Sequence, residues 1–269
     1  MRAWLMMSWW PFPPQTREVQ LDEKWSFVFK KQENCTAEEL EGQRMGDFWD
    51  HVAFDPEHRL VLAVVFGKRF SERVHEVLKQ VRERMAGRVP RLITSDEYSS
   101  YAQAIRRVFS QWVRPKRKKG TKPRNPFRRL LPGLAYAMVH KHRENGRVAE
   151  VTTKVVFGTE ARVQAALAAS TASTHINTSF LERHNGTDRN RNSRKARRTY
   201  CFSKDWEIHR AEGYFTMYSY NFCWCVRSLA QRRDGASCIP RTPAMAAGLT
   251  DRIWTLNDWL KRPVLSLSG

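Results

Sequence analysis

Acidic residues are scarce in this sequence. Its 269 residues include 27 Asp and Glu against 47 Lys and Arg, a formal net charge of +20, and none of the acidic residues falls between residues 98 and 143. Such an excess of positive charge attracts polyanions and makes their binding strongly dependent on salt. Nucleic acid is therefore the first partner to expect and acidic lipid the second. Structural nucleoproteins share this balance, so charge names a class of ligand and no activity.

The chain also lacks long apolar runs and paired cysteines. No run reaches the roughly 18 apolar residues that a membrane-spanning helix needs. The Trp-rich residues 1–11 have one basic residue and no small-x-small cleavage site, unlike a signal peptide. The five cysteines are odd in number and have no C-x-x-C spacing, which argues against a zinc ribbon. We expect a cytoplasmic protein with reduced thiols and no membrane partner.

What the sequence does contain is a strand that carries a carboxylate. Residues 19–29 alternate between a mostly apolar set, which includes Leu21 and Trp25, and a mostly polar set that includes Asp22. The alternation predicts a half-buried strand with Asp22 on its wet face. Because a strand holds its side chains rigidly, Asp22 could be a metal ligand. Taken alone, the stretch also fits an ordinary solvated Asp on an edge strand.

A second carboxylate, Asp96, ends another predicted strand. Residues 48–54 and 60–66 are apolar and flank a Pro-containing turn, so with residues 19–29 they predict a three-stranded antiparallel meander. Residues 71–85 have the apolar spacing of a helix, and residues 91–96 follow as a strand. A right-handed crossover makes that strand parallel to the first and brings Asp96 beside Asp22. Alternatively, Asp96 caps a helix over residues 97–109.

Residues 114–129 form the most basic segment. Nine of these sixteen residues are Lys or Arg, and three prolines and a glycine disfavour a helix. A solvated loop and a loop that binds the phosphate backbone both fit this composition. The predicted DNA contacts in this segment are Arg114, Lys116, Arg117, Lys118, Lys119, Lys122 and Arg124.

A third carboxylate, Glu182, lies in the first turns of a predicted helix capped by Thr178 or Ser179, after a last strand over residues 148–157 and a helix over 158–169. Basic residues follow it, so this helix could ligate a cation at one end and grip phosphates at the other. The alternative is an acid favoured by the helix macrodipole.

An aromatic helix capped by Ser203 and a short helix near residues 253–260 complete the chain. We divide it into an arm (1–18), a core (19–200) and a helical extension packed on the core (201–269).

This order of elements predicts an α/β fold of the ribonuclease-H-like class, a mixed β-sheet flanked by helices. Three ordered segments surround the carboxylates: LDEKWSFV at residues 21–28, TSDEY at 94–98 and NTSFLERHN at 177–185. FSKDW at 202–206 and RTPAMAAGL at 241–249 accompany them. In these segments, and from about residue 19 to residue 260, the chain resembles the IS-one-like branch of the insertion-sequence DDE transposases.

The resemblance implies a catalytic triad of Asp22, Asp96 and Glu182, separated by 74 and 86 residues. In that family the acids would hold two Mg²⁺ ions, for which Mn²⁺ would substitute, and water would cut a DNA strand. The freed 3′ hydroxyl would then join target DNA. Hard oxygen ligands favour Mg²⁺, and two ions can stabilise both reacting oxygens. We place Asp22 on the central strand and Glu23 on its opposite face, as a structural residue.

Residues that follow Glu182 receive roles from their position on the same predicted helix. Asn185 could orient Glu182, and Arg189, about two turns further on, could hold the DNA end. Gly186 costs helix stability and could kink the helix. The predicted phosphate contacts of this region are Arg183, Arg189, Arg194 and Lys195.

The implied partners are the double-stranded DNA of element ends and target, bound by a homo-oligomer in the bacterial or archaeal nucleoid. Family members commonly have a DNA-end-binding segment upstream, which residues 1–18 are too short to supply, so we expect a separate one, or a truncated or decayed copy. A catalytically inactive, basic DNA-binding protein is therefore the main alternative function. A nuclease specific for RNA–DNA hybrids is a third.

Overall fold

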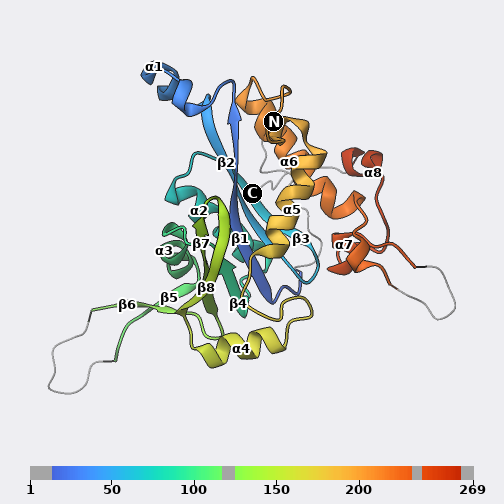
Figure 1. Cartoon of the computed structure of the whole chain (residues 1–269). Coiled ribbons are helices and arrows are strands. Elements are labelled where there is room, and N and C mark those ends of the chain that lie inside the picture. The colour runs from blue at the N-terminus through green and yellow to red at the C-terminus, as the bar shows by residue number, and fades with distance from the viewer. Residues whose placement is uncertain (1–13, 117–124, 232–237, 262–269) are drawn as a thin grey trace, which may run out of the picture.

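A single mixed sheet forms the centre of the molecule. The computed structural model describes residues 14–116, 125–231 and 238–261. In this part of the chain six strands pair in the order β3-β2-β1-β4-β7-β8, with helices on both sides (Figure 1). The strands are β1 (Glu18–Val28), β2 (Gly46–Asp55), β3 (Leu60–Gly67), β4 (Leu92–Ser95), β7 (Ala135–Glu144) and β8 (Arg147–Phe157).

The predicted meander and crossover are both present. Strand β1 pairs antiparallel with β2, which pairs antiparallel with β3. Helix α2 (Ser71–Arg84) then leads to β4, which runs parallel to β1 with Leu21 opposite Ser95. Because β2 and β4 flank it, β1 is an interior strand, as expected.

The polar face of β1 is buried, and its predicted exposure to water was wrong. Gln20, Lys24 and Ser26 are each 3% exposed or less. Helices α5 (Ser179–Arg191) and α6 (Trp206–Cys223) cover this face, and their polar side chains bond to it. Polar groups that leave water need such partners, since burial without a hydrogen bond is costly. The opposite side of the sheet carries α2 and α3 (Ser100–Val108) (Figure 1).

Strand β7 was absent from our prediction, in which residues 148–157 formed the last strand. It pairs parallel with β4 and antiparallel with β8, so the six-stranded sheet contains two strands from beyond Asp96 rather than one. Its first residues are buried and apolar, whereas its second half includes His140, Lys141 and His142. That basic half obscured the apolar pattern, and we predicted no element in this stretch.

The basic segment is partly a strand. Strand β5 (Ser110–Val113) pairs antiparallel with β6 (Phe127–Leu130) as a separate two-stranded sheet. We name residues 110–116 and 125–130 the arm hairpin, and Figure 1 shows it extending away from the body of the molecule. The predicted contacts Arg117, Lys118, Lys119, Lys122 and Arg124 lie outside the described residues.

Several helix starts differ from the predictions. Asp205, rather than Ser203, caps α6 by accepting a hydrogen bond from Ile208 N. Asp96 caps no helix, because α3 begins only at Ser100. The Asp96 carboxylate instead accepts a hydrogen bond from Tyr98 N. Thr178 is the N-cap residue of α5, but its hydroxyl bonds the Glu182 side chain instead of the helix backbone.

The C-terminal region completes the hydrophobic core. Met217 and Phe222 of α6 belong to the same buried cluster as the sheet residues, and Trp254 and Trp259 pack against Phe222. Among the described helices none has the length and apolar character to cross a bilayer. The remaining helices are α1 (Ala37–Glu41), α4 (Glu160–Ala168), α7 (Pro243–Ala246) and α8 (Leu256–Lys261).

Candidate active site

Asp22, Asp96 and Glu182 line one cavity of about 380 Å³. They come from three elements that are far apart in the sequence: the middle of β1, the residue after β4, and the first turn of α5. Leu21 is paired with Ser95, so the next residues, Asp22 and Asp96, follow at the same level of two parallel neighbours. The remaining lining residues are Glu97, Val139 and Lys141.

The surroundings of Asp22 and Asp96 favour the protonated form of both carboxyl groups. Burial, together with the charges of Asp96 and Glu182, raises the pKa of Asp22 to about 6. Burial likewise raises the pKa of Asp96 above its ordinary value. Such clustered, perturbed carboxylates in a cavity are typical of functional sites.

Asn185 orients Asp22, whereas we expected it to orient Glu182. Its Nδ2 donates to Asp22 Oδ2 over 2.7 Å, and Glu23 N donates to Asp22 Oδ1 over 2.9 Å. Both oxygens of Asp22 therefore have a fixed direction. Asn185 lies three residues after Glu182 on α5, and the helix runs without interruption through Gly186.

Glu182 is held by two groups, one of which the sequence analysis missed. Thr178 Oγ1 donates to Glu182 Oε1 over 2.6 Å, and Lys141 of β7 forms an ion pair with the same oxygen. Lys141 was missed because β7 itself was missed. An ammonium group beside the third acid partly neutralises the cluster.

The donor set fits a hard divalent cation, since it consists of carboxylate oxygens whose repulsion a cation would offset. Within residues 14–116, 125–231 and 238–261, no three His, Cys, Asp or Glu side chains are grouped closely enough to hold an ion as they stand. Lys141 is bonded to Glu182 in that arrangement. Binding of a cation by all three acids would therefore require Glu182 to exchange its ammonium partner.

Glu23 lies on the opposite face of β1, as predicted. Its carboxylate accepts from Arg69 over 3.1 Å and interacts with Tyr101 of α3, away from α5. Burial raises the pKa of Glu23 to about 7.

The prediction that Lys195 contacts DNA was wrong. Its side chain is 1% exposed, and its ammonium bonds Asp50 Oδ2 over 2.8 Å. Lys24 bonds the same oxygen over 3.0 Å and also pairs with Asp188 of α5. The two ammonium groups hold the pKa of Asp50 well below its usual value despite its burial. We call Lys24, Asp50, Asp188 and Lys195 the buried ion cluster. No local sequence pattern predicted these ion pairs.

The other predicted contacts have different surroundings. Arg189 donates to the backbone carbonyls of Lys195 and Trp25, over 2.9 and 3.1 Å. Its guanidinium group therefore links α5 to β1 and to the segment that follows α5. Arg194 forms an ion pair with Glu212 over 2.6 Å. Arg183 is exposed on α5, and the exposed Arg114 and Lys116 follow β5 at the end of the arm hairpin that is farther from the body of the molecule.

The chain matches no known protein-family model, and comparison with curated proteins also finds no match.

Proposed function

We propose that this chain is the catalytic part of a DDE transposase, which cuts and joins DNA strands with the help of divalent cations. The observation that carries the proposal is the meeting of Asp22, Asp96 and Glu182 in one cavity. Two of them follow paired positions of parallel strands, and the third faces them from a helix. The mixed sheet, with β1 in its interior and helices on both sides, supports a ribonuclease-H-like fold for the domain.

Each residue of the site has a definite task in this proposal. Asn185 fixes the direction of Asp22, and Thr178 fixes that of Glu182. Two bound Mg²⁺ ions would supply an activated water and stabilise the attacking and leaving oxygens of an in-line displacement. Lys141, released from Glu182, would present its ammonium to a phosphate oxygen of the DNA. The net charge of +20 favours the polyanionic substrate, and a homo-oligomer on double-stranded DNA is part of the proposal.

The test is strand cleavage and joining on duplexes that carry the terminal repeats of the element flanking the gene. With Mg²⁺ or Mn²⁺, the wild-type protein should nick these ends and join them to a target duplex. The Asp96→Asn variant should do neither and should still bind DNA. Equal cleavage by wild type and variant would overturn the proposal.

A non-catalytic DNA-binding protein is the second candidate, because Lys141 already occupies a carboxylate oxygen of Glu182. That candidate requires salt-sensitive DNA binding with no metal-dependent product. The same assay therefore distinguishes the two functions.

A further inference from the structure

Neighbouring cavities with shared lining residues lead away from the acids along helix α5. A second cavity of about 690 Å³ shares Asp22 and Glu182 with the acid cavity and continues along α5 past Asn185 and Gly186. A third cavity of about 470 Å³ shares Arg189, Ala196 and Arg197 with the second. We call this series of cavities the α5 groove.

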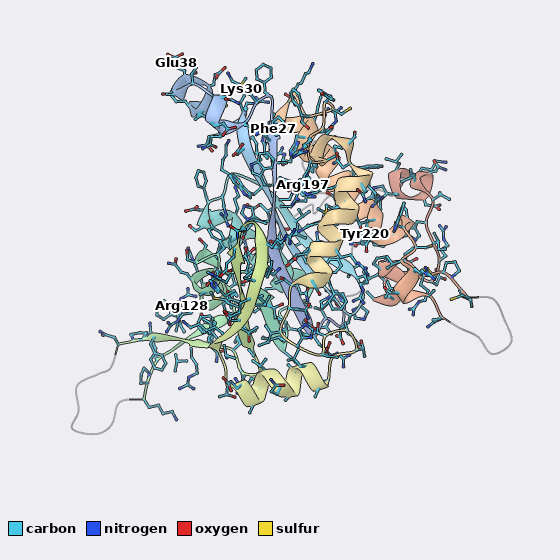
Figure 2. The ribbon with its side chains drawn as sticks, in the orientation of Figure 1. Phe27, Lys30, Glu38, Arg128, Arg197 and Tyr220 are labelled. Atoms are coloured by element: carbon cyan, nitrogen blue, oxygen red, sulfur yellow. The ribbon has the colours of Figure 1, made fainter. Side chains whose placement is uncertain are left out.

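The far end of the α5 groove is basic and aromatic. Arg197, Arg198 and Lys31 line it together with Trp25 and Phe27 from the end of β1. Figure 2 shows Arg197 between α5 and Phe27. Within the described residues, the guanidinium groups of Arg197 and Arg198 make no hydrogen bond or ion pair. They are therefore available to a ligand, unlike Arg189 and Arg194.

Gly186, in the middle of the groove, has no packing reason to be glycine. A Cβ built there would meet nothing within 4 Å. Gly213 in α6 is the contrasting case, because a Cβ there would lie 2.6 Å from Phe66 and 2.7 Å from Lys195. A glycine inside a helix costs about 1 kcal/mol relative to alanine. Glycine at a surface without internal contacts permits close approach of a ligand backbone.

A buried polar atom beside Gly186 has no hydrogen-bond partner among the described residues. Asn185 is 7% exposed and lines the groove beside Gly186, and its Oδ1 is buried without a hydrogen-bond partner. A buried acceptor without a partner is costly in a native protein.

We propose that the α5 groove binds one unpaired strand of nucleic acid that continues from the acid cavity. Its sugar-phosphate backbone crosses Gly186, its phosphates meet Arg197 and Arg198, and a base stacks at Trp25 and Phe27. Stacking on aromatic side chains together with basic contacts is the usual mode of single-strand binding. This inference rests on the proposed function, since it assigns a path to the DNA strand whose end lies at the acids.

The test uses an oligonucleotide duplex with a single-stranded overhang, compared with a blunt duplex, in Ca²⁺ so that binding is measured without cleavage. The wild type should prefer the overhang. Gly186→Gln places a helix-compatible side chain in the groove. It should lower the affinity for the overhang duplex, relative to that for the blunt duplex, by at least tenfold without lowering the melting temperature. Arg197→Ala should weaken overhang binding, whereas Arg106→Ala, at an exposed arginine of α3, should not.

Photocrosslinking gives an independent readout of the strand path. An overhang with 5-iododeoxyuridine should crosslink to the peptide that contains Trp25 and Phe27, in the wild type and in Asp96→Asn alike. Crosslinks elsewhere, or unchanged overhang binding by a folded Gly186→Gln, would overturn the groove assignment. Because Asp96→Asn is expected to bind but not to cut, failure of the groove and failure of the catalytic proposal give different results.

Discussion

Asn185 Nδ2 donates a hydrogen bond to Asp22 Oδ2 over 2.7 Å and so ties helix α5 to the strand that carries the first acid. The bond crosses 163 residues of sequence and fixes the carboxylate that faces Asp96 and Glu182.

Loss of this bond should slow catalysis without loss of DNA binding. Partners that orient a metal-ligating carboxylate typically contribute 10–100-fold to activity or metal affinity. We expect Asn185→Ala to reduce the initial rate of Mn²⁺-dependent nicking by about that factor. Thr187→Ala, on the same helix with its hydroxyl bonded to Arg183 O, is the matched control and should keep the wild-type rate. Equal rates for both variants would show that Asn185 does not position Asp22.

The raised pKa of Asp22 should destabilise the metal-free protein as pH rises. Its value of about 6, against 3.8 for the free group, means that the folded state binds more protons than the unfolded state between these values. The free energy of unfolding therefore falls as pH rises from about 4 to 6, by about 3 kcal/mol from this group.

Denaturant unfolding of wild type and Asp22→Asn at pH 4, 5, 6 and 7 measures this contribution. The variant should have a shallower fall over the same interval, because Asn does not titrate. Parallel curves for the two proteins would contradict the raised pKa of Asp22.

The buried ion cluster should matter for folding and not for DNA binding. Lys195→Met leaves the carboxylate of Asp50 with one ammonium partner in the core, and removal of a buried partner typically costs about 3–5 kcal/mol. Its neighbour Arg194 is partly exposed and pairs with Glu212, so Arg194→Ala should cost less than about 1 kcal/mol. Chemical denaturation of both variants makes the comparison, and a stability for Lys195→Met close to that of wild type would contradict it.

The arm hairpin should contribute to DNA affinity through charge. Arg114 and Lys116 are exposed just beyond the end of β5. If each side chain neutralises one phosphate, each alanine variant should make the negative slope of log K against log salt less steep by about 0.9. Fluorescence anisotropy between 50 and 200 mM salt checks this, with the exposed Arg44 before β2 as the control position. Slopes equal to that of wild type would show that the arm hairpin does not contact the DNA.

The local patterns of the sequence predicted the elements whose signal is short-ranged. Alternation found β1, helical spacing found α2, and the crossover rule made β4 parallel to β1, which brought Asp22 and Asp96 together. Strand β7 was not predicted because half of it is basic, and Lys141 was missed for the same reason. Lys195 looked like a phosphate contact since it stands among arginines, yet its partner Asp50 lies 145 residues away. Pairings at such separation leave no trace in a local pattern.

The central claim is that Asp96 acts with Asp22 and Glu182 in metal-dependent DNA cleavage. Asp96 and Glu97 are adjacent acids that line the same cavity, and only Asp96 belongs to the proposed triad. The most direct measurement is nicking of supercoiled plasmid in Mn²⁺ by wild type, Asp96→Asn and Glu97→Gln, with plasmid binding measured in parallel. We predict nicking by wild type and Glu97→Gln, none by Asp96→Asn, and similar binding by all three. Nicking by Asp96→Asn at the wild-type rate, or none by a folded wild type that binds the plasmid, would contradict the claim.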